Sequence, residues 1–406
     1  MKFIEGGITA ARGFKAGGVN AGIKAGRTKN DLALIASDVP CAAAGLFTRN
    51  KVKAAPVQLD IETVRKGSAR AIIANSGNAN ACAPNDMENA RKMQKLAAEA
   101  LGISADEVLV GSTGVIGVEI NIAAIEKGLP ALAASLSDEA AGSDEAAKAI
   151  MTTDTKKKEQ AAEFEIGGRT VKLGGISKGS GMIHPNMGTM LCYLTTDCAI
   201  DSVTLKKVLK EVCDVTFNRI SVDGDTSTND SLIILANGMA GNEPVIENTE
   251  GYVVFKEALL AVCTDLARRM AADGEGAKHL ITCTVAGCES EEKAEILSKS
   301  VIGSSLTKAA VFGCDANWGR VLCALGYSGA DFDPLKVDVD FVSSAGRIGV
   351  CRQGKGLVFD EDKALEILKQ DEVIIDINMN EGEAAVTCWG CDLTYDYVKI
   401  NGDYRT

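Results

Sequence analysis

The sequence predicts a layered α/β protein with two domains. Short apolar segments, typical of buried strands, alternate along the 406 residues with longer segments of helical periodicity. Glycine is abundant at 42 residues, and aromatic residues make up only 4% of the chain, so tight turns and a core of small aliphatic side chains are expected. The length is enough for two or three domains.

The expected elements follow from this periodicity. Amphipathic patterns predict helices at 87–100, 203–215, 256–272 and 291–300, and Gly102 supplies a stop signal for the first of them. Apolar or alternating segments predict strands at 71–74, 108–110, 191–194, 232–236, 337–342 and 373–377. Two polar segments, 154–163 and 237–251, are the candidate domain breaks, and the first is expected to be a surface loop.

Composition excludes several classes of partner. The net charge is −12 and no basic patch is visible, which argues against nucleic acid and anionic membranes. No apolar run reaches the roughly 18–20 residues that span a bilayer, and the first residues lack the apolar stretch of a signal peptide. The chain is therefore expected to be cytoplasmic, with its thirteen cysteines reduced and mostly buried.

Familiar catalytic and binding motifs are missing. The sequence has neither a phosphate-binding GxxxxGK[ST] loop nor an HExxH zinc motif, and the glycine-rich segment 111–117 is not GxGxxG. The pair Cys388 and Cys391 has no second pair or histidine cluster beside it, so no metal site is expected. His184 and His279 are the only histidines, and structural roles are expected for both.

The most distinctive segment is 174–197, in which a glycine-rich run leads to Gly188, Thr189 and an apolar strand. A threonine hydroxyl can attack the preceding carbonyl, and the resulting ester can be hydrolysed to cut the chain. The new α-amino group of Thr189, with a reference pKa of roughly 7.7–8.0, can then act as base for its own hydroxyl, so no histidine is needed. The alternative is an ordinary Gly-Thr turn that leads into a strand.

Several longer motifs accompany this segment in order along the chain. They are AAGLFTRN at 43–50, ANSGNANA at 74–81, STGVIG at 112–117, AIMTTDT at 149–155, KGSGM at 178–182, SVDGDTSTND at 221–230, FGCDANWGR at 312–320 and WGCDLTYDY at 389–397. With them the sequence resembles the ornithine acetyltransferase family, the glutamate N-acetyltransferases of arginine biosynthesis. The resemblance covers nearly the whole chain and implies the layered two-domain fold of that self-processing family.

The resemblance also assigns roles to residues. It implies a cut between Gly188 and Thr189 into an α fragment, 1–188, and a β fragment, 189–406, with Thr189 as nucleophile. Thr113 and Gly114 match the oxyanion stabilisers. The matches to substrate-binding positions are Thr152, Lys178, Thr189, Glu275, Asn401 and Thr406. One departure is Gly188, because the family usually has alanine before the threonine.

The activity implied is ping-pong transfer of acetyl from N-acetylornithine to glutamate through acetyl-Thr189. No metal or bound cofactor is implied, although acetyl-CoA is a second donor for bifunctional members, and two α and two β fragments are expected to assemble. Both substrates carry an α-carboxylate that Lys178 can bind, and Glu275 can receive the ammonium of ornithine. The asparagine-rich segment 75–80 is expected either to bind substrate or to shape turns.

Two rival functions remain open at this stage. A self-processing amidase or aminopeptidase would pass the acyl group to water instead of glutamate. An uncut protein that binds small molecules would have no reason to appear as two fragments.

Overall fold

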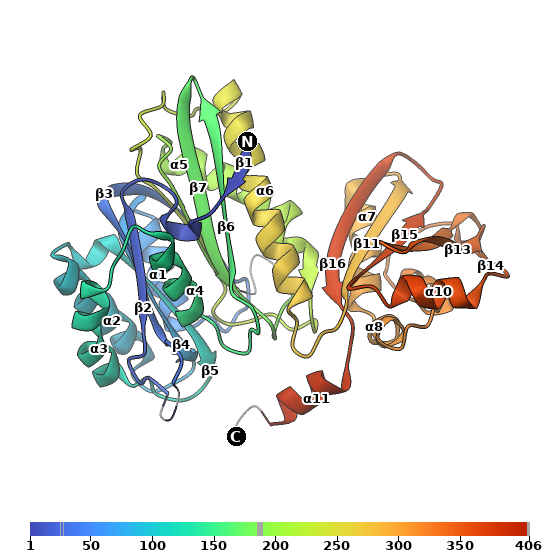
Figure 1. The fold of residues 1–406 in the computed structure, drawn as a ribbon, viewed down its shortest axis with the longest axis horizontal. Helices are drawn as coiled ribbons and strands as arrows, with labels where there is room; N and C mark the ends of the chain where they lie inside the picture. Colours follow the sequence, from blue (N-terminus) through green and yellow to red (C-terminus); the bar gives the residue numbers. More distant parts are fainter. Residues whose placement is uncertain (25, 27, 185–189, 404–406) are drawn as a thin grey trace. The chain divides into compact units, whose positions relative to one another are not determined.

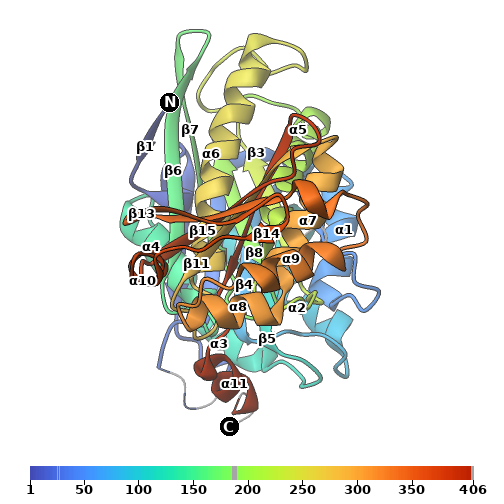
Figure 2. The same cartoon turned by 90° about the vertical axis from the view of Figure 1, so that its right-hand side faces the viewer.

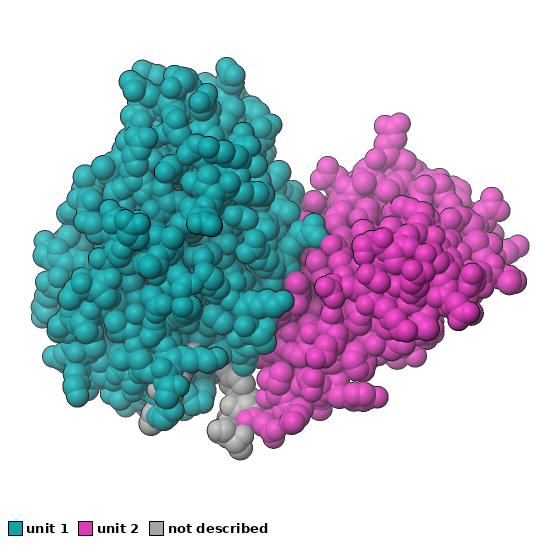
Figure 3. All heavy atoms as spheres, viewed as in Figure 1, with its two compact units in different colours: residues 1–179, 185–218, 226–270 teal, residues 180–184, 219–225, 271–406 magenta. Residues whose placement is uncertain are grey.

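The computed structural model describes residues 1–24, 26, 28–184 and 190–403 (Figures 1 and 2). The chain divides into two compact units, coloured separately in Figure 3. Unit 1 contains residues 1–179, 185–218 and 226–270, and unit 2 contains residues 180–184, 219–225 and 271–406. The expected fragment boundary between residues 188 and 189 lies outside the described residues and stays a prediction.

Within the described residues, unit 1 is built on a nine-stranded sheet (Figure 1). Its strands in spatial order are β1 (Lys2–Ile4), β6 (Lys158–Ile166), β7 (Arg169–Lys178), β8 (Leu191–Thr196), β10 (Ser231–Ala236), β3 (Leu32–Phe47), β4 (Ser68–Asn78) and β5 (Val108–Val115), with β2 (Phe14–Val19) also paired to β3. Its helices are α1 (Ala55–Val64), α2 (Asp86–Leu101), α3 (Ile122–Ala134), α4 (Ala140–Ala149), α5 (Ser202–Val215) and most of α6 (Glu250–Ala272).

Both faces of this sheet are buried, and the alternation of side chains along the strands explains how. Leu32 and Leu34 of β3 belong to a core cluster with residues of α1, α2 and α3, whereas Ala33 and Ile35 belong to a second cluster with residues of α4. Successive side chains of a strand point to opposite faces, so apolar residues at consecutive positions require cover on both sides. The helices supply that cover.

Unit 2 has a sheet of seven strands among its described residues. Their order is β14 (Lys355–Gly356), β13 (Gly346–Arg352), β12 (Asp338–Ser343), β15 (Glu372–Asn378), β11 (Leu280–Cys288), β16 (Ala384–Cys391) and β9 (Ile220–Ser221). Its helices are α7 (Glu291–Gly303), α8 (Ser305–Phe312), α9 (Trp318–Gly326), α10 (Glu361–Leu368) and α11 (Tyr395–Gly402). Alternate residues of β11 and β15, such as Ile281 and Ile375, pack in one core with α7 to α10 (Figure 2).

The predicted α/β class is confirmed, and each predicted strand and helix matches an element of the predicted type, although the strand predicted at 337–342 begins one residue later, at Asp338. One prediction is wrong: segment 154–163 is not a surface loop, because Asp154 and Lys158 are buried and β6 begins at Lys158. Their charges indicated exposure, but the two side chains satisfy each other. Neither polar segment separates the compact units, since 154–163 and 237–251 both lie inside unit 1.

The cysteines and the helix lengths also bear on the sequence analysis. All thirteen cysteines lie among the described residues as free thiols, and most are buried, as predicted. Cys388 and Cys391 lie in β16, where burial raises the pKa of each thiol to about 11. No helix in the described part of the chain is long and apolar enough to cross a membrane.

Candidate functional site

The end of β5 carries Thr113 and Gly114, the predicted oxyanion stabilisers. Gly114 has φ +132°, a value that favours glycine, and a Cβ at this position would lie 2.4 Å from the carbonyl carbon of Gly77 in β4. The ladder is irregular here, because Thr113 is in register with both Ser76 and Asn78. This irregular position of β5 therefore requires glycine at residue 114 for backbone reasons as well as any catalytic one.

Asparagine side chains hold this end of the sheet in shape. Asn75 Nδ2 donates to the carbonyl of Asn78 (2.9 Å), and Asn75 Oδ1 accepts from the Ser112 hydroxyl (2.6 Å). From the segment before β10, Asn229 Nδ2 donates to the carbonyls of Ser112 (2.9 Å) and Ala79 (2.6 Å). Of the two roles considered for 75–80, turn shaping is therefore the one that these contacts perform.

Lys178 ends β7 and is only 7% exposed. Its Nζ donates to Oγ1 of Thr113 over 3.3 Å. A lysine ammonium has donors only, so the threonine oxygen must be the acceptor in this contact. The hydroxyl proton of Thr113 is thereby directed away from Lys178 and can be donated to a third group.

Asp154 connects two of the predicted binding segments. Its carboxylate accepts the backbone N–H of Thr152 (3.1 Å), the backbone N–H of Gly179 (2.8 Å) and the ammonium of Lys158 (2.7 Å). Burial would raise the pKa of this carboxyl, but the positive charges of Lys178 and Lys158 outweigh burial and hold the pKa well below its usual range. Asp154 is therefore ionised at neutral pH and connects the backbone of Thr152 to that of Gly179, the residue after Lys178.

A second carboxyl, that of Asp230, lies directly before β10, and its pKa is shifted in the opposite direction. It is 1% exposed, and burial raises its pKa well above the usual range. Hydrogen bonds from the hydroxyls of Ser227 and Thr48, the charge of Lys178 and the N–H of Met190 oppose this rise without cancelling it. Burial therefore favours the neutral form of the Asp230 carboxyl over its charged form.

Glu275 and Asn401 form a separate group in unit 2. Asn401 Nδ2, on α11, donates to Oε2 of Glu275 over 2.7 Å, and Glu275 is 6% exposed. A Cβ on Gly181 would lie 2.4 Å from the Glu275 carboxylate, so glycine lets this carboxylate rest against the backbone. The two predicted binding residues of unit 2 are thus in direct contact.

Segment 180–184, just before the expected cut, is held in unit 2 by Asp223. The Asp223 carboxylate accepts the backbone N–H groups of Met182 (2.6 Å) and Ile183 (2.9 Å). Tyr397 of α11 donates its hydroxyl to the same carboxylate over 3.3 Å. Burial, followed by the charges of Asp223 and Glu275, raises the pKa of Tyr397, so the phenol stays protonated and keeps this role as donor.

The histidines have structural partners, as predicted. His279 Nδ1 lies 2.8 Å from the Asp392 carboxylate, which also accepts the backbone N–H groups of Lys278 and His279 at the start of β11. His184 Nδ1 lies 3.1 Å from the Ser221 hydroxyl, and burial lowers the pKa of His184. Both rings thus connect segments of unit 2.

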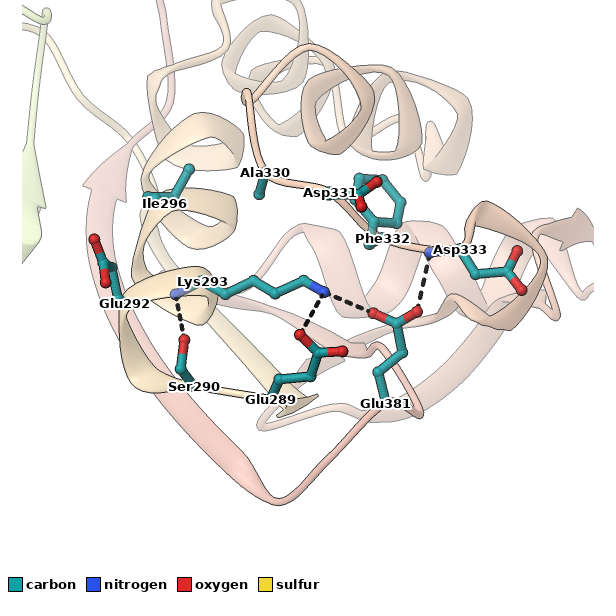
Figure 4. Close-up of a pocket in the computed structure, with 10 residues that line it drawn as sticks. All are labelled: Glu289, Ser290, Glu292, Lys293, Ile296, Ala330, Asp331, Phe332, Asp333 and Glu381. Carbon is teal, nitrogen blue, oxygen red and sulfur yellow. Dashed lines mark hydrogen bonds and ion pairs between the residues drawn. The ribbon is translucent and has the colours of Figure 1, made fainter.

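A hollow of about 540 Å³ in unit 2 contains none of the predicted site residues (Figure 4). Lys293 crosses it and pairs with Glu381 (2.9 Å) and Glu289 (3.6 Å), and Glu381 also accepts the N–H of Asp333 (3.0 Å). These acidic groups are therefore neutralised or bonded within the chain. In the described ranges, no group of three or more His, Cys, Asp or Glu side chains is arranged to hold a metal ion.

The structure therefore brings the predicted residues together in two groups. Thr113, Gly114, Thr152 and Lys178 lie in unit 1, and Glu275 and Asn401 lie in unit 2. The sequence analysis assigned no role to Lys158, Asp154, Asp230, Asn229, Asp223 or Tyr397. Asp154 belongs to the TTD motif, but it also begins the polar segment 154–163, whose composition predicted exposure, so its burial was not expected. Gly188, Thr189 and Thr406 lie outside the described residues.

Fold and site together define a mixed α/β enzyme with a buried lysine beside a glycine at the irregular end of a strand. A family model described as the ArgJ family matches residues 15–406. The chain belongs to the ArgJ family, which confirms the resemblance inferred from the motifs.

Individual relatives match over the full length. The chain is 52% identical to the arginine biosynthesis bifunctional protein ArgJ of Symbiobacterium thermophilum, with 100% of both chains covered. It is 47% identical to the glutamate N-acetyltransferase of Methanocaldococcus jannaschii, again over 100% of both chains. A solved structure of arginine biosynthesis bifunctional protein argJ from Bacillus halodurans is 42% identical, with a TM-score of 0.50, over 52% of this chain and 97% of that one.

The Asp154 ion pair leads to a prediction about stability. Asp154→Asn leaves Lys158 buried without its counter-charge and is expected to lower the free energy of unfolding at pH 7 by about 3–5 kcal/mol. Because the pKa of Asp154 is lowered by folding, its stabilising contribution is fully present above the unfolded value of about 3.9, starts to decrease below that pH, and is lost only as the pH falls through the much lower folded pKa. Urea unfolding of wild type and variant at pH 7, 5 and 3.5 measures this.

The matched control is Asp144→Asn, which breaks the more exposed contacts of Asp144 with Lys148 and Lys157. Such pairs contribute about 0–1 kcal/mol, so only a small loss is expected. An Asp154→Asn loss at pH 7 no larger than that of Asp144→Asn would contradict the assignment of an ionised, buried and paired carboxylate.

Proposed function

We propose that this chain is a glutamate N-acetyltransferase of arginine biosynthesis that moves acetyl from N-acetylornithine to glutamate. The observation that carries the proposal is the buried Lys178–Thr113 contact beside Gly114, in a chain that matches relatives named for this activity over their full length. The contact supplies a cation for a substrate carboxylate and a hydroxyl donor for an oxyanion.

The proposed reaction begins with self-cleavage. The hydroxyl of Thr189 attacks the carbonyl of Gly188, and the amide C–N bond between the two residues breaks, which leaves an ester and frees the α-amino group of Thr189. Water then hydrolyses the ester to the Gly188 carboxylate and the free Thr189 hydroxyl. That amine then takes the proton of the Thr189 hydroxyl as it attacks the acetyl carbon of N-acetylornithine. A C–O bond forms, the C–N bond to the α-nitrogen breaks, and the proton passes to the departing ornithine amine. Glutamate reverses these steps and leaves acetylated.

Thr113 and Gly114 are the proposed oxyanion donors. Because Thr113 Oγ1 accepts from Lys178, its own proton is directed to another acceptor, and the ammonium also strengthens it as a donor. The Gly114 N–H lies at the end of β5, which the adjacent backbone and asparagine contacts hold in place. Donors fixed in advance stabilise a tetrahedral oxyanion without reorganisation cost during reaction.

In unit 1, Lys178 is proposed to bind the α-carboxylate common to N-acetylornithine and glutamate, and Thr152, held through Asp154, is proposed as a further substrate contact. Glu275 and Asn401, which contact each other in unit 2, are assigned to the substrate by the family motifs, and Glu275 suits the side-chain ammonium of ornithine. Thr406 is assigned to the substrate by the family motif alone.

Other parts of the proposal rest on the relatives. The Bacillus halodurans chain, matched over 97% of its length, corresponds to only 52% of this chain, which supports a polypeptide in two pieces. The word bifunctional in two of the relatives' names supports a second activity, and acetyl-CoA is the donor proposed for it. Assembly of two α and two β fragments and a cytoplasmic location complete the proposal. The names favour transfer over the amidase alternative.

The acetylated intermediate is the first test. Enzyme held with N-acetylornithine and no glutamate is expected to carry one acetyl group on Thr189, located by mass spectrometry of the β fragment. Initial rates against both substrates should give parallel double-reciprocal lines, as a covalent intermediate requires. Intersecting lines together with an unmodified fragment would replace this mechanism with direct transfer. Acetate release without glutamate would favour the amidase.

Self-cleavage is tested at the same residue. Thr189→Ala is expected to remain a single chain of 406 residues without transferase activity, because both nucleophilic steps are lost. Amino-terminal sequencing of the wild-type fragments should return Thr-Met-Leu. Mature active enzyme that consists of one intact chain would contradict the processing step.

Thr113→Val removes the hydroxyl while keeping the size of the side chain. An oxyanion donor acts mainly in the transition state, so kcat is expected to fall by about 10²–10³-fold with little change in KM. Thr113→Ser, which retains the hydroxyl, is the control and should keep most of the activity. A pure KM effect would assign Thr113 to substrate binding instead.

A further inference from the structure

The side chain of Tyr193, in β8, reaches β5, the strand that carries the proposed oxyanion donors. Three strands, β10, β3 and β4, lie between β8 and β5 in the sheet. Tyr193 is fully buried, and its hydroxyl oxygen lies only 1.8 Å from the point where a Cβ on Gly111 of β5 would stand. No Cβ atom approaches an oxygen so closely, so residue 111 has to be glycine as long as residue 193 is tyrosine.

This contact lies next to the hydrogen bond between Lys178 and Thr113. Gly111 and Thr113 are two residues apart in β5, so they face the same side of the sheet. The register of β7 and β8 also places Lys178 and Tyr193 on one face, because Lys178 is opposite Leu191, two residues before Tyr193. The pair β7–β8 therefore meets β5 at two successive positions, Tyr193 at Gly111 and Lys178 at Thr113.

Contacts of three kinds hold β5 at this level. It is the last strand of the sheet among the described residues, so it has a ladder partner, β4, on one side only. The carboxylate of Asp60, in α1, accepts the backbone N–H of Val110 over 2.8 Å. Tyr193 adds a contact across the face of the sheet, in a direction that neither the ladder nor α1 supplies. Its hydroxyl limits how closely β5 can approach β8.

We propose that Tyr193 is a positioning residue whose hydroxyl sets the separation of β5 from the pair β7–β8, and with it the position of the Thr113 hydroxyl. The inference rests on the proposed function, because it takes Thr113 to be an oxyanion donor. A changed separation alters the contact of Lys178 with Thr113, and an oxyanion donor is effective only when it is fixed in advance. Tyr193 does not touch the substrate in this arrangement.

A polar role for the hydroxyl is the alternative. In the part of the chain that the structure describes, neither the Tyr193 hydroxyl nor Oδ2 of Asp60 has a hydrogen-bond partner. Burial, followed by the charge of Asp60, raises the pKa of Tyr193, so a hydrogen bond to Asp60 through water would be the function of the hydroxyl in that case. The two roles differ in what can replace the hydroxyl, because a methyl group fills space but donates no hydrogen bond.

The first experiment is a double-mutant cycle on the full-length enzyme. Tyr193→Phe removes the hydroxyl and keeps the ring. Its kcat, expressed per cleaved molecule, is expected to fall by about 10- to 100-fold with little change in KM, because a displaced catalytic group slows the chemical step. In the Thr113→Val background the same substitution should lower kcat by no more than about threefold, since no hydroxyl is left to position. Equal losses in both backgrounds would overturn the proposal.

The second experiment returns a group of similar size to the place of the lost hydroxyl. In Tyr193→Phe with Gly111→Ala, the new Cβ lies 3.1 Å from Cζ of residue 193 and 3.2 Å from Cβ of Ala74, so small shifts accommodate it. The kcat of this double variant is expected to return to within about threefold of wild type. A double variant that folds but stays as slow as Tyr193→Phe would favour the polar role over the spacing role. If it does not fold, the cycle with Thr113 still decides.

Tyr252→Phe is the matched control, because it removes another buried hydroxyl of unit 1, from α6. It is expected to leave kcat unchanged, and an equal fall in this variant would overturn the specific role of Tyr193. Each of these failures leaves acetyl transfer by wild type intact. Wild type that moves no acetyl group from N-acetylornithine would instead remove the proposed function itself, whatever the variants do.

Discussion

The arrangement of the site residues in unit 1 depends on the contacts of the Asp154 carboxylate. It joins the backbone before β6 to the backbone after β7 and pairs with Lys158 in the interior. A buried carboxylate that loses its partners is costly, so this group holds Thr152, Gly179 and the neighbouring Lys178 in one arrangement. Asp154, which pairs with Lys158 four residues later in the sequence, thus sets the position of Lys178, the proposed cation for the substrate.

A second constraint acts at the end of β5, where close backbone packing, and not charge, determines the position of Thr113. Gly114 packs against the backbone of Gly77 more closely than any side chain permits, and Asn229 fixes the adjoining carbonyls from another strand. The contacts leave Thr113 facing Lys178. The buried ion pair positions Lys178, and the close backbone approach positions Thr113. The hydrogen bond between Lys178 and Thr113 therefore depends on both interactions.

The boundaries of the two compact units do not coincide with the expected cut. Segment 180–184 precedes the expected cut but belongs to unit 2, where Asp223 holds its backbone. Conversely, β8 and β10 follow the expected cut but belong to the sheet of unit 1. If the chain is cut as proposed, each fragment contributes to both units, and hydrogen bonds of the sheet itself hold the fragments together.

The sequence by itself determined the elements, the fold class and the family. Apolar periodicity located strands such as β8 and helices such as α2 because burial on one or both faces is recorded in the spacing of side chains. The motifs around Thr113, Lys178 and Thr189 carried the family resemblance, and the family match confirms it.

Only the tertiary structure decided which charges are buried and which partners they have. Asp154 and Lys158 stand in a polar segment that predicts exposure, yet folding places both in the interior beside Lys178. Asp230 and Asp154 are the same residue type, but burial raises the pKa of Asp230, whereas the charges of Lys178 and Lys158 lower the pKa of Asp154. Burial and pairing depend on residues distant in sequence, and local pattern contains no record of them.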